Sequence, residues 1–238
     1  MPEPLATTAD AAFAAVDGVD GWLSEGQVRR LFEATGAVPA GGRIVEIGSF
    51  RGRSTIVLGL AAGSDVEIVA IDPHAGNDRG PQEISGYEAE AADDRTTFLA
   101  NLERAGVADR VRPVRKFSSD AHGDVADPID LLWVDGAHRF GPARADLRDW
   151  GRRVRPGGAL LVHDSWSSIG VTLALVVALA SGRTWRYDGR VGSLASYTKV
   201  PGGVRSALRQ LAELPWFARN VVKKVLITLK LRSGPWPY

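Results

Sequence analysis

The sequence predicts an α/β fold built on one doubly wound, mostly parallel sheet of seven strands with an antiparallel edge strand. Three observations support this. Short apolar segments alternate with helical ones along most of the chain, a glycine-rich turn follows the first strand, and polar residues come where the strands end. Because the carboxyl ends of parallel strands meet at one edge, we expect a ligand to bind at that edge.

The predicted elements follow one another in a regular order. We expect strands at residues 43–47, 66–72, 110–115, 129–135 and 158–164, and helices at 54–62, 88–105, 142–150 and 169–181. Two further strands, 185–187 and 191–199, are predicted to form an antiparallel pair around a turn at Asp188-Gly189. The alternation indicates a parallel sheet, and the last pair closes its edge.

The chain divides into a central domain at 41–200 and two extensions. The N-terminal extension, 1–40, is predicted to be helical, because an alanine-rich segment begins at Asp10 and the spacing of Ser24 and Gln27 is that of a capping box. The C-terminal extension, 201–238, mixes basic and apolar residues at helical spacing. For it we favour packing on this chain or in a homodimer over a peripheral contact with anionic lipid.

Composition narrows the classes of function. The 238 residues are 45% hydrophobic, enough for one large core, and a net charge of +1 does not favour nucleic acid as a partner. No cysteine is present, which excludes disulfides, thiolate nucleophiles and Cys-ligated zinc. The first residues lack the pattern of a signal peptide and the longest apolar run, 171–180, is too short to span a bilayer, so we expect a cytoplasmic protein.

The turn after the first strand has the features of a nucleotide-type cofactor site. Gly48 permits a backbone conformation closed to other residues and lets a ligand approach, and the helix that opens near Arg53 offers unpaired N–H groups to an anion. Glu46 is expected to face the same crevice as an acceptor. The residues assigned to cofactor binding in this segment are Glu46, Gly48, Ser49, Gly52 and Ser54.

The spacing of this turn separates two classes of cofactor. A dinucleotide fingerprint reads G-x-G-x-x-G, whereas this turn reads E-x-G-x-x-x-G, so NAD is disfavoured. Asp72 closes the second strand about twenty residues after the turn, where a carboxylate binds a ribose diol. An adenosine-containing cofactor agrees with both features.

With an acidic-glycine loop and an acid closing the next strand, residues 40–200 resemble the class I S-adenosylmethionine-dependent methyltransferases. The resemblance implies a Rossmann-like methyltransferase sheet and S-adenosylmethionine as cofactor. It also implies that Phe117 and Ser118 lie against the adenine, although an ordinary turn explains these two residues equally well. The alternative for the whole pattern is an α/β protein whose glycines serve only packing.

Histidines and aspartates gather at the predicted strand ends. His74, His138 and His163 come at or after the second, fourth and fifth strands, whereas His122 lies outside this pattern and is predicted to be surface or loop. These positions place three imidazoles along the edge where a ligand is expected.

Asp135 and Asp164 end neighbouring strands, so their carboxylates are expected within a few ångströms of each other. Such a pair repels unless a cation lies between the two groups, and Mg²⁺ favours one or two protein carboxylates. His163 is a candidate third ligand, although on a regular strand its side chain points away from that of Asp164. The alternative is that Asp135 only caps the following helix and Asp164 only ends a strand.

The motifs around these acids resemble those of the metal-dependent O-methyltransferases of sugars and macrolides, the group of macrocin O-methyltransferase. They are Trp133-Val-Asp-Gly-Ala-His138, Arg155-Pro-Gly-Gly158 and Leu160-Leu-Val-His-Asp164. The resemblance implies Asp135, Asp164 and His163 as Mg²⁺ ligands and a sugar, oligosaccharide or glycosylated small molecule as methyl acceptor. Ala137 stands where that group often has a second acid, so His138 becomes the predicted catalytic base.

The position of one tryptophan and the amino-acid composition both favour a sugar as the methyl acceptor. Trp133 is expected in the core, whereas Trp166, beyond the fifth strand, is expected to stack on a pyranose ring. The Arg-, Ala- and Gly-rich composition is typical of a high-GC actinobacterium, in which methylated mannose polysaccharides are one natural acceptor.

Other functions stay open at this point. A cephalosporin-hydroxylase-like relative, a methyltransferase of non-sugar natural products and a non-catalytic S-adenosylmethionine-binding module are the alternatives. A nucleic-acid methyltransferase is disfavoured by the balanced charge and by the lack of an N-P-P-[YF] signature after the fourth strand. The polar loop at 73–86 is either a lid over a ligand or a disordered connection.

Overall fold

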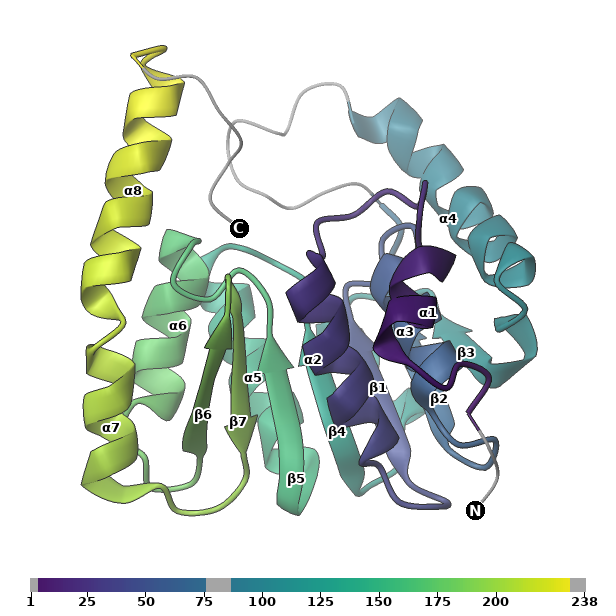
Figure 1. Ribbon diagram of the computed structural model, residues 1–238, viewed down its shortest axis with the longest axis horizontal. Coiled ribbons are helices and arrows are strands. Elements are labelled where there is room, and N and C mark those ends of the chain that lie inside the picture. The colour runs from purple at the N-terminus through teal and green to yellow at the C-terminus, as the bar shows by residue number, and fades with distance from the viewer. Residues whose placement is uncertain (1–3, 76–86, 232–238) are drawn as a thin grey trace.

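One mixed sheet of seven strands forms the centre of the computed structural model, which describes residues 4–75 and 87–231 (Figure 1). The strand order is β3-β2-β1-β4-β5-β7-β6. All neighbours pair in parallel except β7, which is antiparallel to both β5 and β6. The strands are β1 Arg43–Ile47, β2 Glu67–Ile71, β3 Val111–Val114, β4 Ile129–Val134, β5 Val154–Val162, β6 Arg186–Val191 and β7 Leu194–Thr198. The predicted fold class is confirmed.

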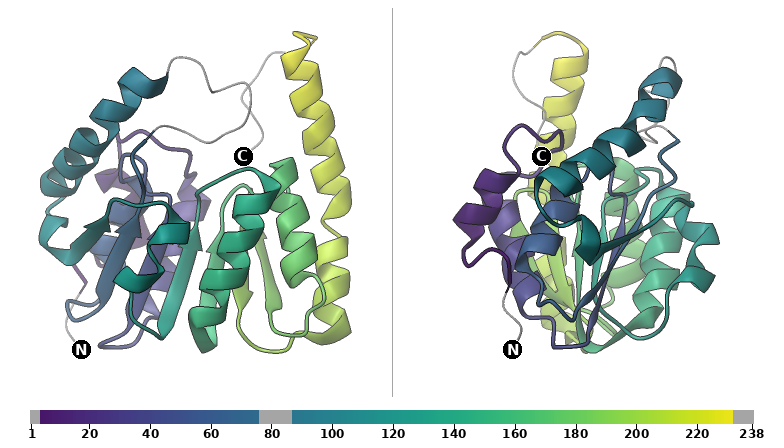
Figure 2. Two further views of the ribbon diagram at one scale, coloured as in Figure 1. Left: turned by 180° about the vertical axis from the view of Figure 1, so that it is seen from behind. Right: turned by 90° about the vertical axis from the view of Figure 1, so that its right-hand side faces the viewer.

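Helices cover both faces of the sheet (Figure 2). They are α1 Ala9–Ala15, α2 Glu25–Gly36, α3 Arg53–Ala61, α4 Tyr87–Arg104, α5 Phe140–Arg153, α6 Ile169–Leu179, α7 Gly203–Leu211 and α8 Leu214–Thr228. Three short 3₁₀ turns lie at Ala108–Arg110, Ser118–Asp120 and His122–Asp124. Buried residues of α1 to α4 share one apolar cluster, and those of α5 and α6 share the other.

Alternate residues of the central strands enter opposite clusters. In β1, Ile44 packs with α1 to α4 whereas Val45 packs with α5 and α6, and in β4 the same division separates Leu131 from Leu132. This follows from the period of two along a strand. Because both faces are covered, these strands are apolar on both sides and read as continuous hydrophobic runs.

The edge pair differs in detail from the predicted one. The predicted turn at Asp188-Gly189 is wrong, because β6 runs through these residues with a shift of register between Tyr187 and Gly189. Gly189 has a φ of 116°, which suits such an irregularity, and the chain reverses at Gly192, whose φ is 57°. The Asp188 carboxylate accepts hydrogen bonds from Arg186 and Thr198 within the pair.

The topology places a ligand crevice where the strand order reverses. From β1 the chain moves to β2 and β3 on one side and later to β4 and β5 on the other, so the carboxyl ends of β1 and β4 flank the switch point. Most of the predicted loop at 73–86 lies outside the described residues. Among the described helices, none combines the length and the apolar character that crossing a bilayer requires.

Glu46 of β1 joins the first strand to the helix that follows it. Its side chain is fully buried, and its two carboxyl oxygens accept hydrogen bonds from the Ser54 hydroxyl and, at 2.5 Å, from the Thr55 hydroxyl. Burial raises the pKa of Glu46 from 4.5 to about 8, although the two hydroxyls act in the opposite direction. The start of α3 is therefore held by a buried acid that prefers its protonated form.

This raised pKa predicts a pH-dependent effect of the substitution Glu46→Gln. Since Glu46 binds its proton more tightly in the folded state than in the unfolded state, its contribution to wild-type stability falls as pH rises from about 4.5 to about 8. Across that window the variant should gain roughly 3–5 kcal/mol relative to wild type. Urea unfolding at several pH values measures this, with the exposed Glu33→Gln as control. A wild-type minus variant difference that does not change with pH would contradict the assignment.

Candidate functional site

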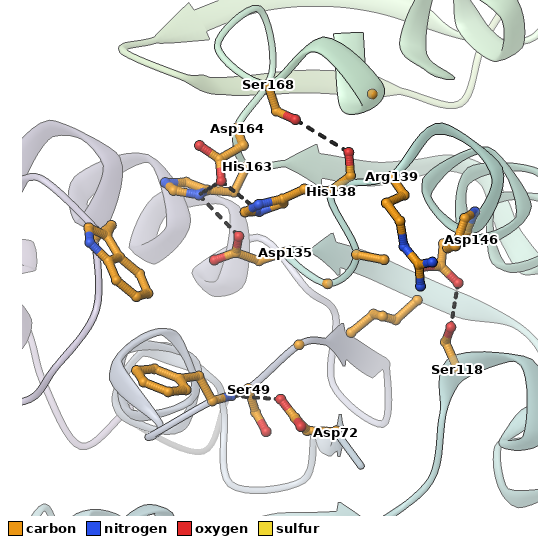
Figure 3. Close-up of a pocket in the computed structure, with 18 of the residues that line it drawn as sticks. Ser49, Asp72, Ser118, Asp135, His138, Arg139, Asp146, His163, Asp164 and Ser168 are labelled. Carbon is orange, nitrogen blue, oxygen red and sulfur yellow. Dashed lines mark hydrogen bonds and ion pairs between the residues drawn. The ribbon is translucent and has the colours of Figure 1, made fainter. Parts of the chain in front are cut away.

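A large cavity lies at the carboxyl edge of the sheet (Figure 3). Its volume is about 1440 Å³, whereas pockets for one drug-sized ligand hold about 300–1,000 Å³. The loops after β1, β2, β4 and β5 line it, together with residues 20–23 on one side and α8 on the other. The cavity therefore has room for two small molecules side by side.

Gly48 brings two backbones into close contact at the mouth of this cavity. Its φ is 86°, and a Cβ at this position would lie 2.6 Å from the carbonyl carbon of Asp135. Hydrogen bonds hold the same region: the Gly48 N–H donates to Ile71 and the Asp135 N–H donates to Ile47, at 2.9 and 2.8 Å. Only glycine satisfies both the backbone conformation and the contact.

The other residues of this turn are arranged around Asp72. The Asp72 carboxylate accepts the backbone N–H groups of Phe50 and His74, at 2.8 and 2.7 Å. The His74 ring in turn contacts the Phe50 carbonyl oxygen at 3.0 Å, where its Nε2–H donates. Ser49 is 2% exposed and lines the cavity, and its hydroxyl has no hydrogen-bond partner among the described residues. That hydroxyl is therefore available to a polar ligand.

Two members of the predicted cofactor set have other structural roles. Glu46 does not line the cavity, because Ser54 and Thr55 occupy both of its oxygens behind the turn. The expected orientation of Glu46 toward the crevice is therefore wrong. Gly52 has a φ of 91° and precedes α3, with Phe98 beneath it. Ser54 lines the cavity but gives its hydroxyl hydrogen to Glu46.

Asp135, His138 and Asp164 form one cluster on the opposite wall (Figure 3). Each offers one potential ligand atom, and these atoms all lie within 4.8 Å of one another. His138 Nε2 lies 2.8 Å from Asp164 Oδ2. The second oxygen of Asp164, Oδ1, is buried without a hydrogen-bond partner in the described part of the chain. This unpartnered oxygen and the two other groups fit a divalent cation.

His163 completes the cluster from behind. Its Nδ1 lies 3.1 Å from Asp135 Oδ1 and 3.6 Å from Asp164 Oδ2. The fifth strand ends at Val162, two residues before its predicted end, and Asp164 takes a left-handed φ of 54°. His163 and Asp164 therefore leave the strand alternation and both line the cavity. His163 was predicted as a metal ligand, and its ring contacts the carboxylates of Asp135 and Asp164. The imidazole whose nitrogen lies with these carboxylates in the possible metal-binding group is that of His138.

The charges of this cluster depend on one another. Burial alone would lower the pKa of His163, but the carboxylates of Asp135 and Asp164 raise it well above its ordinary value. Burial would likewise raise the pKa of Asp164, and the two histidines hold it well below its usual range. Two neighbouring carboxylates thus share the cavity wall with two imidazoles.

The third wall lies after β3. Phe117 is 59% exposed and lines the cavity, and the Ser118 hydroxyl donates to Asp146 Oδ1 at 2.5 Å. Asp146 on α5 is buried, which raises its pKa to about 6. His122 lies in the connection after β3, which agrees with the predicted loop position, but it also lines the cavity and stacks on Trp150. The 3₁₀ turns after β3 bring it there.

The aromatic residues of the site are not those expected. Trp133 lies in the core as predicted, but Trp166 is fully buried as well, so it presents no face to a pyranose ring. Trp22, which is 40% exposed, stacks instead on Phe50 with ring centroids 5.7 Å apart, and both line the cavity. No sequence motif marks Trp22, because it enters the site from the N-terminal extension.

Comparison with known proteins gives a family and a fold. The model of a family described as a methyltransferase domain matches residues 45–165, just over half of the chain. Catechol O-methyltransferase from Mycobacterium tuberculosis (strain ATCC 25618 / H37Rv) is 32% identical over 144 residues, 60% of this chain and 56% of that relative. The chain thus spans little more than half the length of this curated relative.

Two solved structures share the fold. The cofactor-bound protein Rv0187 from MTB is 25% identical, with a TM-score of 0.54 over 82% of this chain and 89% of that one. The O-methyltransferase TomG from Streptomyces achromogenes, solved in complex with SAM, is 21% identical, with a TM-score of 0.55 over 83% and 91% of the two chains.

Substituting two glycines by alanine distinguishes the cost of backbone strain from the cost of the close contact at Gly48. Gly41 also has a positive φ, 71°, but a Cβ there would meet nothing within 4 Å. Gly41→Ala should therefore cost about 1–2 kcal/mol from the left-handed conformation alone. Gly48→Ala adds the collision with Asp135 and should cost roughly 3 kcal/mol or more. Equal losses in chemical unfolding would show that the contact with Asp135 carries no weight.

Proposed function

Because this chain belongs to the methyltransferase-domain family, we propose that it transfers a methyl group from S-adenosylmethionine to a hydroxyl of a small molecule. The acceptor we favour is a sugar, oligosaccharide or glycosylated compound. The observation that carries the proposal is one cavity in which the Gly48 turn and Asp72 face the cluster of Asp135, His138 and Asp164.

The donor would lie on the side of β1 and β2. The turn at Gly48 admits a ligand against the backbone, and the buried Ser49 hydroxyl can bind one of its polar groups. Asp72 lines the cavity and is held by two backbone N–H groups, and its remaining lone pairs would accept the hydroxyls of a ribose diol. Phe117 and the Ser118–Asp146 pair would then lie at the adenine.

The acceptor would lie between the acid cluster and the aromatic pair. Trp22 and Phe50 provide a ring-sized apolar surface, which suits the C–H face of a sugar as well as an aromatic ring. Methyl transfer is an in-line displacement, so these walls align the hydroxyl oxygen with the methyl carbon and exclude water.

His138 is the residue we assign to take the proton of the acceptor hydroxyl. Its Nε2–H donates to Asp164, and this hydrogen bond fixes the tautomer in which Nδ1 is the basic atom. Asp164 also stabilises the imidazolium that forms when Nδ1 accepts the proton. His163 keeps Asp135 and Asp164 in place by contacting both carboxylates.

The carboxylates on this wall of the cavity are also suited to binding a divalent cation. Asp135 and Asp164 would hold it through their carboxylates, and the unpartnered Oδ1 of Asp164 supports this. Bound Mg²⁺ supplies Lewis-acid chemistry that lowers the pKa of a hydroxyl and orients a vicinal diol. A homodimer stays a prediction from the sequence.

Methyl transfer should depend on His138. The variant His138→Ala is expected to lower turnover by about two to four orders of magnitude, because the proton loses its acceptor, while S-adenosylmethionine still binds. Transfer of labelled methyl groups to a panel of free sugars, glycosides and catechol measures turnover, and calorimetry measures donor binding. His122→Ala, which removes another imidazole of the cavity, is the matched control. Equal turnover in the two variants would remove His138 from the mechanism.

Cation binding can be tested without the reaction. Titration of the protein with Mg²⁺, and with Mn²⁺ for comparison, should show one site in the calorimeter, and Asp164→Asn should weaken it by at least about tenfold. The exposed Asp109→Asn serves as control. If the wild-type protein transfers methyl groups but binds neither ion, the proposed cation site is wrong, whereas the proposed role of His138 as the base is unaffected.

A further inference from the structure

The C-terminal helices expose their apolar side chains and bury polar ones. We use the name C-terminal arm for residues 203–231, which contain α7 and α8. On α7 the buried residues are Ser206 and Gln210. Along the arm eight large apolar side chains are exposed, at 42–75%: Val204, Leu208, Leu211, Leu214, Val222, Val225, Leu229 and Leu231.

The polar residues that α7 buries form hydrogen bonds with the domain, and these bonds hold the helix with its polar side inward. The Ser206 hydroxyl accepts the backbone N–H of Tyr187 at 2.8 Å. Gln210 accepts the Tyr197 hydroxyl hydrogen and donates to the Leu179 carbonyl, both at 3.3 Å. The α7 helix therefore presents its apolar side to the outside because its polar side is bonded to β6, β7 and the end of α6.

The α8 helix is only partly covered by the described residues. Of its 15 residues only Asn220 is buried. Its contacts with the domain include Asn220 with the Trp166 carbonyl, Lys224 with the Ser167 hydroxyl, and Trp216 with the Arg190 guanidinium. The expected packing on this chain is found for α7, which contacts the edge strand β6, whereas the described residues cover α8 only in part. Figure 1 shows α8 standing at the edge of the molecule beside α6.

The charge of the arm differs from that of the rest of the chain. The arm contains six Lys or Arg residues and one acid, a net charge of +5, whereas the whole chain has +1, so the remaining residues carry −4. The single acid, Glu213, accepts hydrogen bonds from Tyr187 and Arg190 of β6 and faces the sheet. Apart from Glu213, the charged side chains of the arm are thus all cationic, and exposed apolar residues that do not line the cavity, such as Leu208 and Val222, lie among them.

From these observations we infer that the C-terminal arm binds the surface of an anionic lipid bilayer. Exposed aliphatic side chains would enter the boundary between headgroups and acyl chains, and the surrounding cations would meet anionic headgroups. A symmetric contact between two copies is disfavoured, because it places one +5 surface on another. Nucleic acid would use the cations but would leave the aliphatic side chains exposed to water.

Flotation of the full-length protein with vesicles tests this inference. The protein should float with vesicles of equal parts phosphatidylglycerol and phosphatidylcholine, and it should stay below those of phosphatidylcholine alone. Leu208→Ser/Val222→Ser and Arg219→Glu/Lys230→Glu change exposed residues that do not line the cavity. Each pair should lower binding by about tenfold or more. Arg104→Glu/Arg152→Glu, an equal charge change on exposed arginines elsewhere, should bind like wild type.

Other outcomes would overturn the inference. The first is no flotation of the wild type, and the second is equal flotation of all variants. The third is a dimer in sedimentation that Leu208→Ser/Val222→Ser dissociates, since a second copy would then cover the arm. The fourth is RNA binding that depends on the cations but not on the aliphatic residues. Thermal unfolding of each variant confirms that a loss of flotation is not a loss of fold.

Discussion

The close approach of two backbones, at Gly48 and at Asp135, is the constraint on which the site depends. Parallel pairing puts Ile47 beside Val134, so the residues after these strands must meet at the switch point. A side chain at position 48 would push the two loops apart. Because glycine stands there, the turn that suits an adenosyl donor and the wall that holds the acids face one cavity, and methyl transfer between two small molecules becomes a geometric possibility.

The acid wall illustrates how buried charges are tolerated. Asp164 and His163 are both nearly inaccessible, and each would be costly to bury alone. Together with Asp135 and His138 they form a chain of contacts of 2.8–3.6 Å in which every carboxylate touches an imidazole. The same contacts shift the pKa of His163 upward and that of Asp164 downward, so each charge stabilises the other. The irregular backbone after β5 makes this possible, because two consecutive side chains then face one direction.

Much of this arrangement follows from periodicity and spacing. The strand alternation, the parallel sheet and the proximity of Asp135 and Asp164 were predictable, because a residue that ends a buried strand has its position set by the sheet. Positions beyond the strand ends were less predictable. His122 enters the cavity through two short turns, Trp22 through the N-terminal extension, and Glu46 turns away from it because two hydroxyls on α3 bind its carboxyl group. The burial of the polar side of α7 could not be predicted either, because periodicity shows that a helix is amphipathic but does not show which of its sides faces inward.

Val225 and Leu229 belong to two surfaces at once. Both are exposed on the C-terminal arm, and both line the cavity. Any binding event that shifts α8 therefore changes the free energy of binding at the other surface, and linkage requires the two effects to be equal in size. A ligand that touches these two side chains and a bilayer that takes up the arm would therefore be coupled through one helix.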